Sequence, residues 1–200
     1  MYKGFLRWRH SKGFGVHSPY AYRFVTEVLR PGNYGYYAYR EIEGTTREKE
    51  KNSLNFIRHV RFLIRLAIFL NIKRIIVNIS CQEAELAARA LNITYQIAET
   101  PEKTDFQSHD LLLIEGNFKN NEPANAGTLG DKSKKAEKLI LKAKDHKIAI
   151  FTINPSKHLR DILQTPIRRG LLLHDKSRLL LIPREEMAYV SYSMTLKPRL

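Results

Sequence analysis

The amino-acid sequence predicts an α/β fold of three layers, with helices on both faces of a mostly parallel, doubly wound sheet. From Lys73 onward, short apolar runs of strand length alternate with helical segments, which is the order typical of parallel sheets. The C-terminal part differs, because two apolar runs at 171–174 and 179–182 flank a polar turn at 175–177. That pattern predicts a C-terminal antiparallel hairpin.

The N-terminal residues 1–70 predict a helical cap, and residues 71–200 predict the sheet domain, the two together forming one compact unit. The segment 13–25 reads GFGVHSPYAYRFV. Ser18 suits the N-cap of a helix and Pro19 suits its first position, so a helix is expected near 19–29. A turn near 31–33 and two further helices, near 38–50 and 52–70, are expected to follow.

The helix at 52–70 has apolar residues on two sides, which predicts packing on both. Arg58, Arg61 and Arg65 fill a narrow strip between these sides and are expected to emerge along one edge. That strip could be solvated, form salt bridges or contact nucleic acid. Its charges also exclude a membrane span in the most apolar window, 54–72.

The elements after Lys73 follow from apolar runs and periodicity. The predicted strands cover 74–79, 93–98, 111–114 and 147–153, with a further edge strand at 188–194. A helix is expected at 82–91, and another around 134–144, where lysines line the face opposite the apolar residues. The tract 116–130 predicts a long loop.

One connection is too short for a full unit of the sheet. Only residues 100–109 separate Glu99, which ends the second predicted strand, from Asp110, which begins the third. A parallel crossover with its helix needs a dozen or more residues in the connection alone. We therefore predict that this connection contains no crossover helix.

Composition limits the class of protein. The chain has 200 residues, 43% of them hydrophobic, which suits one domain with a full core. A single cysteine, Cys81, and a start without an apolar run predict a cytoplasmic protein without disulfides or a signal peptide. The net charge of +14 suggests an anionic partner, either nucleic acid or an acidic protein. Oligomeric state is left open.

The segment GFGVHSPYAYRFV resembles the N-terminal signature of a bacterial family of class I S-adenosylmethionine-dependent methyltransferase-like proteins. The resemblance implies a Rossmann-like, methyltransferase-type sheet that binds S-adenosylmethionine at the carboxyl ends of its strands. The sequence IEGNF at 114–118 is similar to an Asp-Gly-Asn-His element of the family. Gly116 and Asn117 match that element, whereas Glu115 and Phe118 depart from it.

Candidate binding residues collect at the carboxyl edge of the predicted sheet, where ligands of open α/β sheets bind. The cofactor candidates are Asn78, Ser80, Glu99 and Glu115. The resemblance implies that Glu99 is the acidic residue that holds the cofactor ribose. On the substrate side the candidates are His17, Asn117 and Asn154.

Other chemistry is less defined. His17 could instead be a buried histidine that bonds to backbone and fixes the N-terminal helix. Cys81 could be a nucleophile or a small packed residue. No catalytic residue is assigned, and the seven histidines show no metal-ligand spacing, so no metal is expected.

The turn after the first predicted strand departs from the family. The family has a glycine-rich turn there, whereas this chain has VNISCQEAEL, with no glycine between Lys73 and Leu91. Asn78, Ser80 and Cys81 are expected to crowd the cofactor space. The resemblance also implies a helix and a further strand between Glu99 and Asp110, so one strand-helix unit is expected to be missing there. Together these departures predict a degenerate, non-catalytic methyltransferase-like scaffold or binding module. The alternatives are an active methyltransferase of unknown acceptor and a basic nucleic-acid-binding protein.

Overall fold

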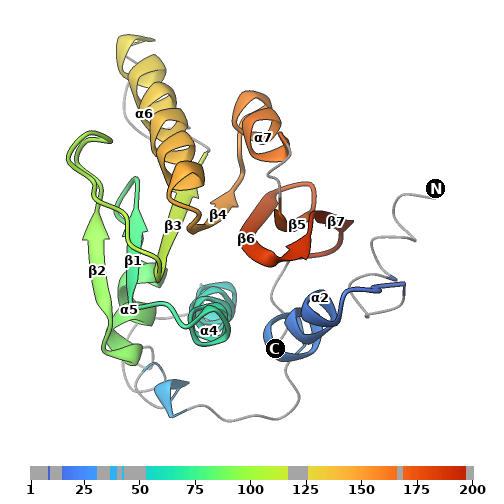
Figure 1. Cartoon of the computed structure of the whole chain (residues 1–200). Helices are drawn as coiled ribbons and strands as arrows, with labels where there is room; N and C mark the ends of the chain where they lie inside the picture. Colours follow the sequence, from blue (N-terminus) through green and yellow to red (C-terminus); the bar gives the residue numbers. More distant parts are fainter. Residues whose placement is uncertain are drawn as a thin grey trace.

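The fold is built on a seven-stranded sheet in which every described strand except β6 runs parallel to β1 (Figure 1). The strand order is β2-β1-β3-β4-β6-β5-β7. The computed structural model describes residues 9, 15–30, 37–39, 42, 53–116, 126–165 and 169–196. The strands are β1 (Arg74–Val77), β2 (Thr94–Ile97), β3 (Asp110–Glu115), β4 (Ala149–Ile153), β5 (Arg169–His174), β6 (Arg178–Ala188) and β7 (Val190–Ser193).

These strands confirm the predicted α/β class, the mostly parallel sheet and the C-terminal antiparallel hairpin. The central strands β1 and β3 consist almost entirely of buried aliphatic residues, as expected for parallel strands covered on both faces. At the hairpin turn, the Asp175 carboxylate accepts hydrogen bonds from the backbone N–H groups of Ser177 and Arg178. The predicted last strand is β7, which forms an edge of the sheet beside β5.

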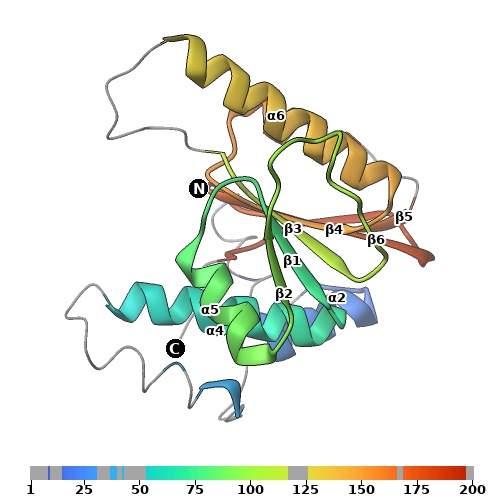
Figure 2. The same cartoon turned by 90° about the vertical axis from the view of Figure 1, so that its left-hand side faces the viewer.

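The N-terminal helices and α5 cover one face of the sheet (Figure 2). They are α2 (Pro19–Phe24), the π-helical turn η1 (Val25–Leu29), α4 (Ser53–Leu70) and α5 (Gln82–Leu91). As predicted, the Ser18 hydroxyl caps α2 by accepting from the N–H of Ala21, and Pro19 opens the helix. Helix α4 packs against α5 and shares one apolar core with it, so the N-terminal helices rest on the sheet's own core.

The opposite face is covered by α6 (Ala126–Asp145), α7 (Lys157–Gln164) and the connection from β2 to β3. As predicted, residues 98–109 contain neither helix nor strand. The connection crosses β1 on the α6 face and places Phe106 and Ala98 in the second core, with residues of α6. Strand β2 is therefore the edge of the sheet.

Two expectations need correction. Helix α6 begins at Ala126, so residues 126–130 of the predicted loop are helical, and helix α7 was not predicted. The arginine strip of α4 does not emerge along an edge over its whole length, because Arg65 is only 4% exposed, whereas Arg58 and Arg61 are partly exposed. The predicted turn at 31–33 lies outside the described residues, and so does most of the predicted helix at 38–50. The described residues of that predicted helix, 38, 39 and 42, are helical.

No helix in the described part of the chain is both long enough and apolar enough to span a membrane.

Candidate functional site

The direction of winding reverses at β1, because β2 and β3 lie on opposite sides of it. The crevice at the carboxyl ends of two such strands is where open α/β sheets bind ligands. The residues that follow β1 and the last residue of β3 therefore form the candidate site. Asn78 and Glu115 meet there, as predicted.

Asn78 closes this crevice with its own side chain. Its Oδ1 accepts from the backbone N–H of Glu115 at 3.0 Å, and its Nδ2 donates to the backbone C=O of Glu115 at 3.2 Å. The side chain is buried. Both functional ends of the amide are thus used to join the exits of β1 and β3.

The turn between β1 and α5 is filled in a similar way. The Tyr95 hydroxyl, which comes from β2, accepts a hydrogen bond from the backbone N–H of Cys81 at 3.0 Å. Glu83 lies in the first turn of α5, where its negative charge is favoured by the helix dipole. A helix N-terminus at this place is a ready site for a ligand anion, and here a carboxylate of the chain is already beside it.

A cavity of about 170 Å³ is left at this edge, between α4 and the ends of the strands. Phe62, Leu63, Phe151 and Ile153 form its apolar wall. Its polar lining comes from five residues on separate elements: His59, Cys81, Glu83, Glu115 and Arg178.

Three of these residues form a chain of polar contacts. The Nη2 of Arg178 donates to the Nε2 of His59 at 2.7 Å, since a guanidinium has no acceptor. The Nδ1 of His59 lies 3.9 Å from the Glu83 carboxylate. This contact with His59 is the main cause that lowers the pKa of Glu83. Burial lowers the pKa of Arg178.

Cys81 is a poor nucleophile in this setting. Burial, together with the nearby Glu83 charge, raises the pKa of its thiol to about 11. The thiol contacts the Glu83 carboxylate at 3.5 Å. Because only the thiolate attacks, the structure favours the packed role over the nucleophilic one.

The other predicted cofactor and substrate residues do not join this cluster. Ser80, Glu99 and Asn154 are exposed. Asn154 has a left-handed backbone with φ of 48°, which asparagine tolerates better than most residues. Asn117 and Phe118 lie outside the described residues.

His17 is exposed, which corrects the interpretation of it as a buried histidine. The contact with the sheet is made by backbone instead, because the N–H groups of His17 and Ser18 both donate to the Tyr192 hydroxyl. Tyr192 is on β7, at the opposite edge of the sheet from β2. His17 is therefore far across the sheet from Asn78.

Gly116, which matches the family element, has a packing reason to be glycine. Its N–H donates to the C=O of Ile153 at 2.8 Å, so the exits of β3 and β4 lie close together. A Cβ at this position would lie 2.6 Å from the Cα of Pro155 and 2.8 Å from the backbone O of Asn154. The retained glycine therefore does not by itself indicate a binding site.

Sequence reasoning missed His59, Glu83 and Arg178. They come from α4, α5 and β6, so no local spacing connects them. The only available signal was position, since Glu83 opens the helix after the first strand and Arg178 opens β6 at the same sheet edge.

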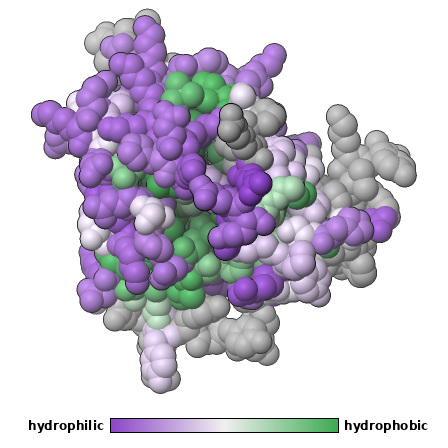
Figure 3. Space-filling model, viewed as in Figure 1, coloured by the Kyte–Doolittle hydropathy of each residue, from purple (hydrophilic) through white to green (hydrophobic). Residues whose placement is uncertain are grey.

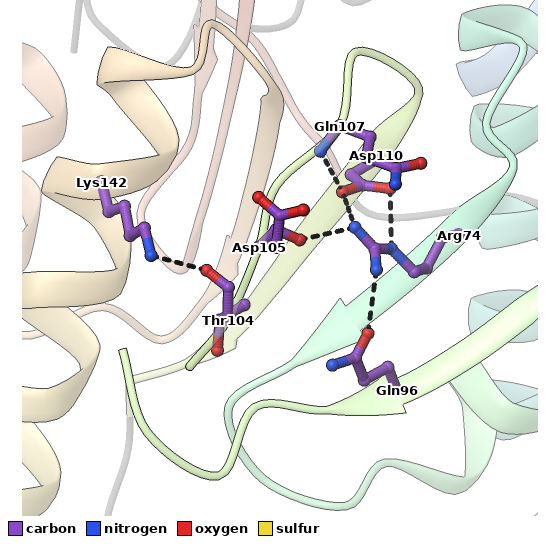
Figure 4. A network of polar contacts seen from close by, with 7 residues as sticks. All are labelled: Arg74, Gln96, Thr104, Asp105, Gln107, Asp110 and Lys142. Carbon is purple, nitrogen blue, oxygen red and sulfur yellow. Dashed lines mark hydrogen bonds and ion pairs between the residues drawn. The ribbon is translucent and has the colours of Figure 1, made fainter. Parts of the chain in front are cut away.

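The amino edge of the sheet carries a different polar network (Figure 4). Arg74 pairs with Asp110 through two hydrogen bonds, of 3.0 Å and 2.6 Å, and also donates to Gln96 and to the backbone of Asp105. Lys142 of α6 donates to the backbone C=O of Thr104 at 2.7 Å. These contacts fix the short connection from β2 to β3, so we assign them a structural role.

The same edge has a broad groove of about 1140 Å³. Figure 3 shows apolar surface in a hollow ringed by hydrophilic side chains, and Phe69, Leu70 and Ile182 are among the residues that line the groove. The charged groups at its rim are paired with one another, as in Lys147 with Glu185 and Arg184 with Glu186.

Lysines of α6 form the clearest basic surface among the described residues, and Figure 3 shows hydrophilic side chains over this helix. Lys142 and Lys144 donate to backbone carbonyls, and Lys138 pairs with Glu102. Lys132, Lys134 and Lys135 have no such partner in the described structure. We call these three residues the α6 lysine group.

Comparison with protein-family models, with curated proteins and with solved structures found no match. Within the described residues, no group of three or more His, Cys, Asp or Glu side chains could hold a metal ion.

Proposed function

We propose that this chain is a degenerate, non-catalytic methyltransferase-like protein that acts as a scaffold or binding module. The observation that carries the proposal is that side chains close the crevice at the carboxyl ends of β1 and β3, where the direction of winding reverses. Asn78 joins the exits of β1 and β3, the Tyr95 hydroxyl occupies the N–H of Cys81, and Glu83 lies at the N-terminus of α5. Side chains of the protein thus take the places where a cofactor would be held.

The strand order supports the methyltransferase-type ancestry. Doubly wound sheets of the order 3-2-1-4-5-6 have a third strand outside the second. The parallel strands β2-β1-β3-β4 fit the 2-1-4-5 part of that arrangement with the outer strand and its helix removed. The direct connection at 98–109 is consistent with this loss. The lost strand and helix would have formed the wall that flanks the adenine of S-adenosylmethionine.

The size of the cavity supports the loss of cofactor binding. Sites for ligands of cofactor size enclose about 300–1,000 Å³. The cavity at the carboxyl edge measures about 170 Å³, which is enough for a few water molecules or a very small solute. The amino-edge groove is larger, but it lies at the amino ends of the parallel strands, whereas open α/β sheets bind ligands at the carboxyl ends.

Calorimetric titration with S-adenosylmethionine tests the proposal. We expect no saturable heat and no thermal shift at millimolar ligand. Saturable binding in the micromolar range would contradict the non-catalytic proposal and favour the active methyltransferase.

The α6 lysine group favours an anionic partner. If that partner is a nucleic acid, the salt dependence of binding can be predicted. Lysines contact phosphate as point charges without reading sequence. Binding to a duplex oligonucleotide should weaken as salt rises, and a variant with Lys132, Lys134 and Lys135 changed to Gln should lower the slope of log K against log salt by about 2.7.

The control has the same change in net charge. It replaces Lys73, Lys103 and Lys176, which are exposed elsewhere on the surface, by Gln. We expect this control to leave the salt slope near that of the wild type. A flat salt response, or equal slopes for the two triple variants, would remove the nucleic-acid role of α6.

A further inference from the structure

The amino-edge groove is a large concave surface that the proposed function does not use. It measures about 1140 Å³, and its walls come from α2, α4, the connection before β3, the turn from α6 to β4, β5 and β6. Pockets for small ligands rarely exceed about 1,000 Å³, so this groove has room for a longer molecule. An apolar hollow with a polar rim is typical of a surface that binds another protein (Figure 3).

The floor of the groove is apolar. Phe69 and Leu70, at the end of α4, are half-buried and line the groove together with Ala149 of β4 and Ile182 of β6. The Phe69 ring packs against the ring of Tyr20, with 5.1 Å between the ring centroids. The floor is therefore fixed by the core beneath it and can receive apolar side chains.

The rim of the groove is charged but nearly neutral in sum. Four cationic and four anionic side chains line the groove, apart from one histidine. Lys147 pairs with Glu185, and Arg184 pairs with Glu186. The groove thus differs from the chain as a whole, whose net charge is +14. This balance favours an uncharged occupant over a nucleic acid.

Strand β6 brings backbone without a strand partner to the groove. Its residues 184–187 extend beyond the last register pair with β4 and bulge out between two register pairs with β5. Among the described strands, none is in register with these four residues. The side chain of Arg169 bonds one of their carbonyls, that of Glu185, at 2.7 Å. An extended peptide can add to such a strand through main-chain hydrogen bonds, while its side chains enter pockets beside it.

We propose that the amino-edge groove binds an extended, uncharged, apolar segment of a partner protein, which adds to residues 184–187 of β6. This inference rests on the proposed function as a binding module and names the chemistry of the partner. Alternate side chains of an extended segment point to one side, so they enter the apolar floor at Phe69, Leu70 and Ile182. The groove is separate from the closed crevice at Asn78.

The test is selection from a phage-displayed library of random heptapeptides on the full chain, followed by fluorescence anisotropy with the most enriched peptide. We expect peptides without net charge and with apolar residues at alternate positions. Ser108 is exposed and lines the groove, so Ser108→Trp should fill it and weaken peptide binding at least tenfold. Gln107→Trp, exposed outside the groove, should leave the affinity unchanged. Bound peptide should slow hydrogen exchange of the backbone at 184–187.

No enrichment, or equal affinity in the two tryptophan variants, would overturn the proposal, and unchanged exchange at 184–187 would overturn the addition to β6. Acidic peptides whose binding weakens with salt would overturn the choice of an uncharged segment. In sedimentation equilibrium, a dimer that Ser108→Trp dissociates would assign the groove to a second copy of the chain instead. If no peptide binds and S-adenosylmethionine also gives no heat, the groove assignment fails while the non-catalytic proposal stands.

Discussion

The two ends of the β1–β3 strand pair are closed by side chains of different chemistry. At the amino end, the Arg74 guanidinium and the Asp110 carboxylate form a charged pair, with the Asp110 side chain 2% exposed. At the carboxyl end, the neutral amide of Asn78 bonds both backbone groups of Glu115. Both ends of this strand pair are therefore bridged by side chains, although the cavity left at the carboxyl edge is much smaller than the groove at the amino edge.

The charged end should contribute most to stability. In an Asp110→Ala variant, Arg74 and the backbone N–H of Gln107 lose their shared acceptor. Breaking one partner of a buried ion pair costs about 3–5 kcal/mol, and we expect a loss of that order in urea unfolding. Lys138→Gln is the matched control, because its pair with Glu102 is exposed to solvent and should contribute little to stability. Equal losses in the two variants would contradict a structural role for Arg74 and Asp110.

The closed carboxyl end should suppress the reactivity of Cys81. With a thiol pKa of about 11, only about one thiol in a thousand is ionised at pH 8. Alkylation by iodoacetamide, followed by mass spectrometry, should therefore be about 100-fold slower than for free cysteine. Glu83→Gln should speed the reaction, because the Glu83 charge raises the pKa of the thiol. A rate equal to that of free cysteine would show that the edge is open.

Removal of the neutral Asn78 side chain should lower the free energy of unfolding less than removal of the charged Asp110 side chain. Asn78→Ala leaves the N–H and C=O of Glu115 without the amide, which costs about 1–3 kcal/mol of unfolding free energy. Asn55→Ala, exposed on α4, should stay within about 0.5 kcal/mol of the wild type. If both variants unfold at the wild-type urea concentration, Asn78 does not close the crevice.

Glu83 provides the smallest and pH-dependent effect. Its folded-state pKa is lowered, mainly by His59, so its stabilisation is present above the unfolded pKa and is lost as pH falls through the folded value. The difference in unfolding free energy between wild type and Glu83→Gln should be less than about 1 kcal/mol at pH 7, since the side chain is 30% exposed. It should shrink as the pH falls below the unfolded pKa of a glutamate and through the lower folded value. A difference that stays constant from pH 7 into the acid range would contradict a lowered pKa of Glu83.

Much of the fold was predictable because apolar runs mark buried strands directly. The apolar run at 74–79 predicted the central strand, which ends two residues earlier at Val77, and the short connection after Glu99 predicted a crossover without a helix. The start of α6 was not predicted, because glycines at 126–130 are typical of loops. Helix α7, capped by Ser156, was not predicted because it is too short to show a clear helical periodicity. Local pattern therefore located most elements but not all their ends.

The candidate site was less predictable, because it depends on contacts between distant parts of the chain. The positions of Asn78 and Glu115 at the ends of two strands predicted that they lie close together. They did not predict the two hydrogen bonds between the Asn78 amide and the Glu115 backbone. Burial of Arg65 depends on η1 lying over α4, which a helical wheel cannot show. The His17 side chain was misjudged, since the backbone of that residue, not the imidazole, contacts Tyr192.

The most direct measurement is hydrogen exchange and chemical shift of the Asn78 side-chain amide and the Glu115 backbone N–H, followed by NMR with and without millimolar S-adenosylmethionine. Our account predicts slow exchange at both groups and no shift on adding the ligand, because each is already bonded to the other. Rapid exchange without ligand, or saturable shifts at Asn78 and Glu115 with it, would contradict a crevice closed by the protein's own side chains.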